Sequence, residues 1–375
     1  MGLVGDLRPE RDQARALPQG VRGRGGLRGA RRHGHPAPGD LRPLPEGARS
    51  RRALRPLHRV AAPEGARIRG RRDRPRGQPR HHHPRRRGEA ISPEGAGRNG
   101  RMRIGSLEVG RGALLAPLCG VSTRPFRKIC RRLGAAVVFS ETVSADGLYL
   151  LNKKTLDLAR FDPEERPIGV QIFGCDPERI AVAARIVEDL VRPDLIDLNF
   201  GCPVGKFVRN DKGAALLKDP PRVGRIVEAV VRAVSVPVTA KVRAGWDEGS
   251  VRTSEIARII EGAGASLLTV HARTRSQGYR GEANWTWIGE AVRAVKIPVI
   301  GNGDVTDAET AEKRMAESGS AGVMIGRAAI GNPWIFHAIE RRMTTGADPE
   351  PPSTEERLSV NHEHLAHQLE DKATP

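Results

Sequence analysis

The stretch Leu195-Ile196-Asp197-Leu198-Asn199-Phe200-Gly201-Cys202-Pro203 places a thiol directly after an apolar run that ends in asparagine. Residues 195–199 predict a buried strand, because such strands are nearly continuous in apolar residues. A cysteine just after a strand of this kind lies at the mouth of a sheet or barrel, where chemistry can reach it. The remaining apolar runs decide between these two folds.

Short runs rich in Val, Ile and Leu alternate with amphipathic stretches from Gly112 onward, as in repeated β-α units with a parallel sheet. The predicted strands are residues 112–116, 137–140, 169–173, 195–199, 236–242, 267–271, 298–301 and 322–325. The predicted helices are residues 124–133, 177–190, 221–234, 251–263, 285–295, 307–318 and 332–342. Eight strands close a TIM (β/α)8 barrel, and polar residues cluster at the strand ends as in barrel active sites. The sequence therefore favours the barrel over a doubly wound open sheet.

The first hundred residues differ in composition from the rest of the chain. They hold 25 Arg, no Lys, no Cys, no aromatic residue and 9 acidic residues, and so carry +16 of the formal net charge of +19. Such a segment cannot bury a core, and we expect disorder. It is a basic RNA-binding arm, a targeting segment or the product of a start codon assigned too far upstream. The absence of Lys favours the last, with Met102 as the natural start.

These patterns divide the chain into three parts. Residues 1–101 are the Arg-, Gly- and Pro-rich extension, and residues 102–331 are the barrel. Residues 332–375 are a partial C-terminal helical region.

Cysteine spacing and hydropathy limit the classes of protein to which the chain can belong. No CxxC pair, secretory signal or long apolar run is present, which predicts a reduced, cytoplasmic protein without a disulfide framework, a zinc site or a membrane span. The run His81-His82-His83 is flanked by Pro and Arg and has no fixed frame, so we predict no metal site there. The four cysteines are Cys119, Cys130, Cys175 and Cys202.

Glycines and a cation follow the last two predicted strands, in Gly301-Asn302-Gly303-Asp304 and Ile325-Gly326-Arg327-Ala328. The loops after strands seven and eight are where TIM barrels commonly bind a phosphate, through backbone N–H groups that glycine leaves open. Arg327 is the candidate charge partner. Together the two segments predict a phosphate site.

Other strand ends carry groups suited to a large, flat ligand with polar edges. They are Gln171, Lys241, His271 and Arg273. Lys241 lies within an apolar run, where a lysine needs an anion or a charge partner. Together with the phosphate site this set predicts flavin mononucleotide (FMN). No GxGxxG follows the first strand, so a Rossmann domain is not indicated.

Seven segments then match one family in order and spacing. They are LAPLCGVSTRPFR (115–127), VQI (170–172), NFGCP (199–203) with Lys206 and GAALL (213–217), AKVR (240–243), HARTR (271–275), GNGD (301–304) and MIGRA (324–328). Through them the chain from about Met102 to Glu340 resembles the tRNA-dihydrouridine synthases, flavin enzymes that reduce uridine in transfer RNA. The segment Asn199 to Pro203 is most similar to the bacterial B-type branch.

The resemblance implies roles for individual residues. It implies that Cys202 protonates C5 of the uracil ring while reduced FMN delivers hydride to C6, with NADPH as the reductant. It implies flavin contacts for Pro117, Leu118, Cys119, Gln171, Lys241, His271, Asn302, Gly303, Asp304, Gly326 and Arg327. It implies substrate or RNA contacts for Asn199, Lys206, Arg209, Arg273 and Arg275. We expect a monomer that binds tRNA and neither a membrane nor a metal.

The chain also departs from the family pattern. Leu118-Cys119 and Ser122-Thr123 replace the usual Met-Ala and Thr-Asp, and residues 355–371 lack an aromatic residue for base stacking, so we expect weak tRNA affinity. Two alternatives stay open. An FMN barrel acting on a small molecule, as in the dihydroorotate-type dehydrogenases, would be indifferent to RNA. A non-enzymatic RNA-binding protein using residues 1–101 would not need Cys202.

Overall fold

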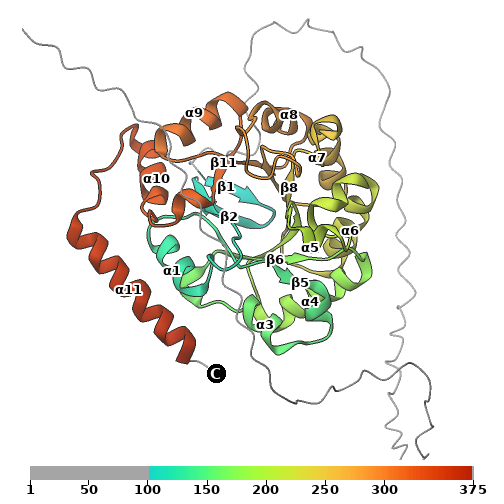
Figure 1. Ribbon diagram of the computed structural model, residues 1–375, viewed down its shortest axis with the longest axis horizontal. Coiled ribbons are helices and arrows are strands. Elements are labelled where there is room, and N and C mark those ends of the chain that lie inside the picture. Colours follow the sequence, from blue (N-terminus) through green and yellow to red (C-terminus); the bar gives the residue numbers. More distant parts are fainter. Residues whose placement is uncertain (1–100, 111, 374–375) are drawn as a thin grey trace, which may run out of the picture. The chain divides into compact units, whose positions relative to one another are not determined.

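Eight parallel strands form a ring around a common axis in the computed structural model, which describes residues 101–110 and 112–373 (Figure 1). The ring order is β3-β11-β10-β9-β8-β7-β6-β4. Two backbone hydrogen bonds of 2.9 Å close it, from the Leu115 N–H to the Val137 carbonyl and from the Ala136 N–H to the Ala113 carbonyl. The TIM barrel is confirmed, and the open doubly wound sheet is excluded. The predictions for residues 1–100 lie outside the described residues.

Each of the eight predicted strands is found within a few residues of its predicted bounds. They are β3 (Ala113–Leu115), β4 (Val138–Phe139), β6 (Ile168–Phe173), β7 (Leu195–Phe200), β8 (Val238–Arg243), β9 (Leu267–His271), β10 (Val299–Asn302) and β11 (Gly322–Ile325). A further two-residue strand, β5 (Val143–Ser144), also pairs with β6.

Helices alternate with the strands and surround the barrel (Figure 1). The seven predicted ones are α1 (Arg124–Arg132), α4 (Pro177–Val191), α6 (Pro220–Ala233), α7 (Thr253–Gly262), α8 (Thr286–Ala294), α9 (Ala308–Ser318) and α10 (Ile335–Thr345). Asp176 and Asp219 cap α4 and α6 by accepting backbone N–H groups, and a proline follows each of them.

Shorter helical turns were not predicted, because an element of one or two turns shows no clear apolar period. They are α2 (Ala145–Tyr149), α3 (Lys153–Ala159), α5 (Gly205–Val208) and the 3-10 turns η1 (Pro163–Glu165), η2 (Gly213–Lys218), η3 (Glu248–Ser250) and η4 (Arg327–Ala329).

An antiparallel hairpin, also unpredicted, opens the described chain. Strand β1 (Arg101–Ile104) pairs with β2 (Leu107–Gly110). Met102, Ile104 and Val109 are buried and pack against apolar side chains at the amino ends of the barrel strands. The hairpin therefore fills the amino end of the barrel and leaves the carboxyl ends of the strands for chemistry.

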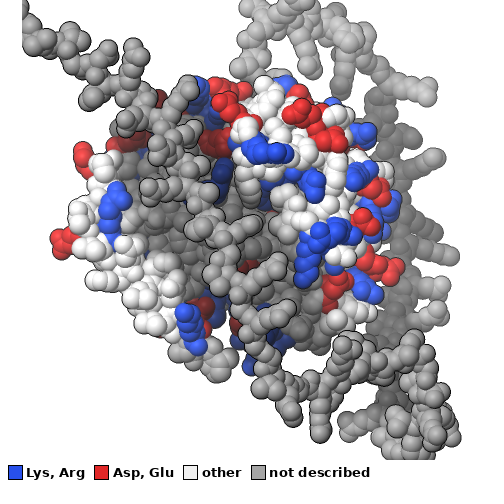
Figure 2. Space-filling model, in the orientation of Figure 1, with Lys and Arg blue, Asp and Glu red and all other residues white. Residues whose placement is uncertain are grey.

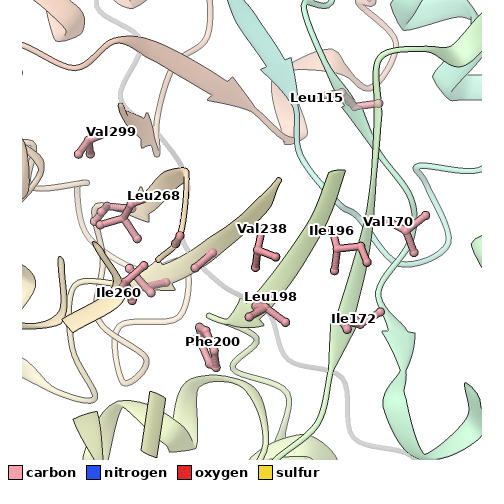
Figure 3. Packing of buried hydrophobic residues seen from close by; sticks show 14 of the residues in the cluster. Leu115, Val170, Ile172, Ile196, Leu198, Phe200, Val238, Ile260, Leu268 and Val299 are labelled. Carbon is pink, nitrogen blue, oxygen red and sulfur yellow. The ribbon is translucent and has the colours of Figure 1, made fainter. Parts of the chain in front are cut away.

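Side chains of the barrel strands alternate between the helix layer and the barrel axis. Figure 3 shows Ile196, Leu198 and Phe200 of β7 in the apolar cluster of the barrel. Asp197 and Asn199, the residues between them, are also buried and lie on the opposite side of β7. The axis thus carries polar side chains inside an otherwise apolar strand.

The last described helix, α11 (Thr354–Ala373), lies within the C-terminal region that was expected to be helical. It packs against α1, where Arg124 pairs with Asp371 and Arg132 pairs with Glu363 at 2.5 Å. None of the helices in residues 101–110 and 112–373 is long and apolar enough to cross a membrane. The same residues contain no group of three or more His, Cys, Asp or Glu placed to hold a metal ion.

Candidate active site

Cys202 follows the carboxyl end of β7, and several hydrogen bonds fix its backbone. Its N–H donates to Asn199 Oδ1 at 3.0 Å, and its carbonyl accepts from the Ala214 N–H at 3.1 Å. Arg243, at the end of β8, donates from Nε to the Gly201 carbonyl at 3.0 Å. The thiol is partly buried, and burial raises its pKa above the ordinary value of 9.0. Cys202 therefore remains a protonated thiol at neutral pH.

Gly213 packs directly against the backbone of Cys202. Its φ is +60°, and a Cβ added to it would lie 2.8 Å from the Cys202 carbonyl oxygen.

We expect Gly213→Ala to displace Cys202 and to change its alkylation rate about tenfold, because reactivity is sensitive to small displacements. Mass mapping of the alkylated peptide measures this rate. Gly205→Ala is the control, since its φ is ordinary and its Cβ would meet only Arg209 Nη1, at 3.4 Å. Equal alkylation rates in both variants would contradict the prediction.

A buried network connects Cys202 to the barrel axis through Asn199. Asn199 Nδ2 donates to Gln171 Oε1 at 2.7 Å, and Gln171 Nε2 donates to Asp197 Oδ2 at 2.7 Å. Thr239 Oγ1 donates to the other Asp197 oxygen at 2.6 Å. The Asp197 carboxylate only accepts, so it fixes the orientation of the Gln171 amide and, through it, that of Asn199. Gln171 and Asn199 were predicted as site residues, whereas Asp197 and Thr239 were missed.

Burial raises the pKa of Asp197 from 3.8 to about 6. The folded state therefore holds this proton more tightly than the unfolded chain, and stability falls as the pH rises from about 4 to 6. The loss above pH 6 is about 3 kcal/mol, at about 1.4 kcal/mol per pKa unit.

Asp197→Asn cannot ionise and should lack this loss. We expect the free energy of unfolding of the wild type to decrease relative to that of Asp197→Asn by up to about 3 kcal/mol between pH 4 and 7. Denaturant unfolding at both pH values measures the difference. Asp211→Asn, at an exposed carboxyl, is the control. If the free energies of unfolding of wild type and Asp197→Asn differ by the same amount at both pH values, the prediction is wrong.

Lys241 brings a cation to the barrel axis. Its Nζ donates to Asn302 Oδ1 at 2.9 Å, and Asn302 Nδ2 donates to the Met324 carbonyl at 2.7 Å. Burial and the nearby Arg243 lower the Lys241 pKa to about 8, so the side chain is mostly charged at pH 7. Among the described residues its hydrogen-bond partner is this neutral amide. Lys241 and Asn302, each predicted to contact the flavin, therefore lie together, and the lysine supplies a charge suited to an anionic ligand.

Two buried polar atoms on β9 have no hydrogen-bond partner among the described residues, namely Thr269 Oγ1 and His271 Nδ1. Thr269 lies opposite Lys241 in the register of β8 and β9, and His271 lies opposite Arg243. Burial, aided by Lys241, lowers the His271 pKa well below 6.5, so the ring is neutral. A buried polar atom without a partner costs about 1–3 kcal/mol, which a ligand could offset.

The ends of β10 and β11 carry the predicted phosphate residues. Gly303 has a φ of +134°, and Gly326 precedes the turn η4. Asp304 accepts from Arg273 at 2.9 and 2.6 Å, and Arg327 Nη2 lies 3.5 Å from Asp304 Oδ1. Arg273 is buried, whereas 61% of the Arg327 side chain is exposed. Arg327 is therefore open to an anion, while Arg273 is engaged within the protein.

The loop after β3 holds the first group of predicted flavin residues. Pro117 and Leu118 are partly buried, and Cys119 is exposed. The Leu118 N–H donates to Ser122 Oγ at 2.9 Å, and the same hydroxyl donates to the Leu118 carbonyl at 3.1 Å. Arg127 Nη1 donates to the Ser122 carbonyl at 2.7 Å. Because Arg127 belongs to α1, this helix supports the conformation of the loop.

The cations predicted to contact RNA follow strands β7 and β9. Lys206 and Arg209 are exposed on the segment after Cys202, and Arg275 lies over the Trp246 ring. Tyr279 is a further candidate that the sequence analysis missed. Its side chain is 59% exposed, with Arg327 Cζ 5.0 Å and Arg243 Cζ 5.6 Å from its ring centroid.

Two surface hollows are lined by other residues. One is lined by residues 282–286, 314 and 317, and the other by residues 248, 276, 277, 280 and 281. Neither is lined by Cys202 or Lys241. We place the site at the strand ends because the buried charges and the unpaired polar atoms are found there.

Known proteins resemble the chain over the same region. Residues 114–374 match the family model described as dihydrouridine synthase (Dus). A probable tRNA-dihydrouridine synthase of Rickettsia bellii is 39% identical, over 70% of this chain and 81% of its own length. The tRNA-dihydrouridine synthase B of Pseudomonas putida is 43% identical, over 71% of this chain and 78% of its own length.

Among solved structures, a 2-naphthoyl-CoA reductase in complex with 2-naphthoyl-CoA matches with a TM-score of 0.50 and 15% identity. The match covers 66% of this chain and 52% of that one. At this level of identity the likeness concerns the fold alone.

Proposed function

This chain belongs to the dihydrouridine synthase family, and from that premise we propose that it reduces the C5=C6 bond of uridine in tRNA. We propose FMN as its bound cofactor and NADPH as the reductant. The observation that carries the proposal is a fixed, protonated Cys202 thiol that directly follows β7, the strand next to that of the partly buried cation Lys241. A proton donor and a cation are the two groups that this reduction requires of the protein.

The residues present fit a flavin mononucleotide. Lys241 supplies a positive charge from the barrel axis, and the unpaired atoms of Thr269 and His271 supply hydrogen-bonding capacity beside it. The glycines at the ends of β10 and β11 leave backbone open to a phosphate, with the exposed Arg327 as its charge partner. When bound, the flavin supplies the hydride that adds to C6 of the uracil.

The chain's own part in the reaction is a proton transfer. Cys202 donates the proton from Sγ to C5, and the S–H bond breaks as the C–H bond forms. The positive charges of Arg243 and Lys241 favour the resulting thiolate. A proton from solvent then restores the thiol.

Substrate access follows from the same geometry. A uridine reaches the end of β7 only after it leaves its stack in the tRNA. The exposed Tyr279 ring and the exposed cations Lys206 and Arg209 offer contacts for a base and for phosphates. We propose a monomeric enzyme that works in the cytoplasm, where its four cysteines stay reduced.

Mass spectrometry tests the proposal. Unmodified tRNA is incubated with the full chain, FMN and NADPH, and the expected result is a two-hydrogen mass gain at a uridine. A protein that binds flavin but leaves the tRNA unchanged would overturn the proposal, and would favour a flavin enzyme that acts on a small molecule.

A further inference from the structure

Lys218, Trp246 and Arg275 form a cluster that we call the Trp246 site. Lys218 Nζ lies 3.6 Å from the centroid of the indole ring, and Arg275 Cζ lies 4.5 Å from it. The three residues come from the end of η2, the loop after β8 and the loop after β9. One aromatic ring thus holds two cations from different parts of the chain.

Among the residues that the structure describes, both cations of the Trp246 site lack a carboxylate partner. On the face shown in Figure 2, Lys and Arg side chains are interspersed with Asp and Glu. Within residues 101–110 and 112–373, by contrast, no carboxylate oxygen lies within 4.0 Å of the Lys218 or Arg275 nitrogens. Arg275 Nε is moreover buried and has no hydrogen-bond partner in this described part of the chain. The site therefore has unused donors as well as unbalanced charge.

The two charges are also close together. The sum of their distances to the ring, about 8 Å, is the most that can separate them. At this separation two like charges repel each other, and more strongly where the protein excludes water. A bound anion would remove this repulsion.

Backbone hydrogen bonds hold the loops of the Trp246 site in place. The Arg275 N–H donates to the Gly245 carbonyl, and the Ser276 N–H donates to the Trp246 carbonyl, both at 2.9 Å. Gly245 also packs closely, because a Cβ added to it would lie 2.6 Å from the Ser250 carbonyl oxygen. The loops that carry Trp246 and Arg275 are therefore already ordered, so less freedom is lost when an anion binds.

The Trp246 site lies on the same end of the barrel as Cys202. Turn η2 begins at Gly213, which touches Cys202, and ends at Lys218. At about 2 Å per residue in a 3-10 helix, the turn separates its two ends by roughly 10 Å. A nucleic-acid strand carries one phosphate per nucleotide, so an RNA with a nucleotide at Cys202 places neighbouring phosphates within this range.

We infer that the Trp246 site binds a backbone phosphate of the tRNA, and that Trp246 serves as the scaffold for its two cations. This inference rests on the proposed function and deepens it. A phosphate contact positions the RNA without reading its sequence. The site therefore contributes to affinity for any tRNA that presents its backbone there.

Salt-dependent binding tests the inference. The affinity of the full chain for unmodified tRNA is measured over a series of salt concentrations for Lys218→Ala and Arg275→Ala. Each variant is expected to bind about 3- to 10-fold more weakly and to lower the slope of log affinity against log salt by about 0.7–1. Lys296→Ala removes the same charge from the loop before β10, at the amino end of the barrel, and should keep the wild-type slope.

Three outcomes would overturn the inference. A wild-type slope in both Lys218→Ala and Arg275→Ala overturns the site and leaves the proposed function standing. A rise in the KM for NADPH, with tRNA affinity unchanged, assigns the site to a phosphate of that reductant instead. A wild-type protein that neither binds nor modifies tRNA overturns the proposed function and the site together.

Discussion

Replacing Cys202 by alanine is expected to lower the rate of uridine reduction by about 10²- to 10⁴-fold, the contribution of a positioned proton donor. Asn199 and Ala214 fix the backbone on which the thiol stands, and burial keeps the thiol protonated. Alanine preserves the backbone contacts and removes only the Sγ–H. The rate is followed as the two-hydrogen mass gain of unmodified tRNA, with saturating FMN and NADPH.

Two comparisons isolate the role of the Cys202 proton. Cys175→Ala removes another partly buried thiol and should react at the wild-type rate. Flavin content should be the same in Cys202→Ala as in wild type, because the expected loss concerns protonation of the substrate. Because burial raises the Cys202 pKa above 9.0, the wild-type rate should not decline through loss of this proton below pH 9. A Cys202→Ala protein with an undiminished rate would show that another group donates the proton.

The barrel could be predicted because each of its strands is a local apolar run that helices interrupt at regular intervals. The hairpin formed by β1 and β2 was missed, although the alternation in Arg101-Met102-Arg103-Ile104 carries the signal of a half-buried strand. Four residues beside a low-complexity extension are too short a run for this period of two to stand out.

Part of the site could be predicted for a similar reason. Lys241 is conspicuous in an apolar strand, and Cys202 is conspicuous after one. The role of Asp197 depends instead on register, since its partners Gln171 and Thr239 lie 26 and 42 residues away along the chain. Sequence spacing does not show which side chains meet across a barrel.

Loop conformation limited the prediction in the same way. Arg273 and Arg275 are two residues apart, and both were assigned to RNA contacts. In the structure Arg273 is buried against Asp304, whereas Arg275 lies over Trp246. Since neither role has been tested, the assignment of Arg273 to RNA stays a prediction.

Arg127→Ala is expected to destabilise the protein by about 3–5 kcal/mol, the cost of breaking a buried ion pair from one side. The side chains of Arg127 and its partner Glu165 are 2% and 0% exposed. Arg127 also donates to the Ser122 and Arg160 carbonyls, at 2.7 and 3.1 Å. Alanine leaves the Glu165 carboxylate buried without its cation and these two carbonyls without their donor.

The effect should extend from stability to the flavin loop. Ser122 holds both backbone groups of Leu118, so loss of Arg127 removes the support of a segment that we assign to the cofactor. Denaturant unfolding and flavin titration measure the two effects.

Arg132→Ala, on the same helix but in a more exposed pair with Glu363, should cost no more than about 1 kcal/mol. Arg127→Met combined with Glu165→Gln should be more stable than Arg127→Ala, because no charge is left buried alone. If this double variant is no more stable, the unpaired carboxylate is not the cause, and the lost bonds to the Ser122 and Arg160 carbonyls explain the destabilisation instead.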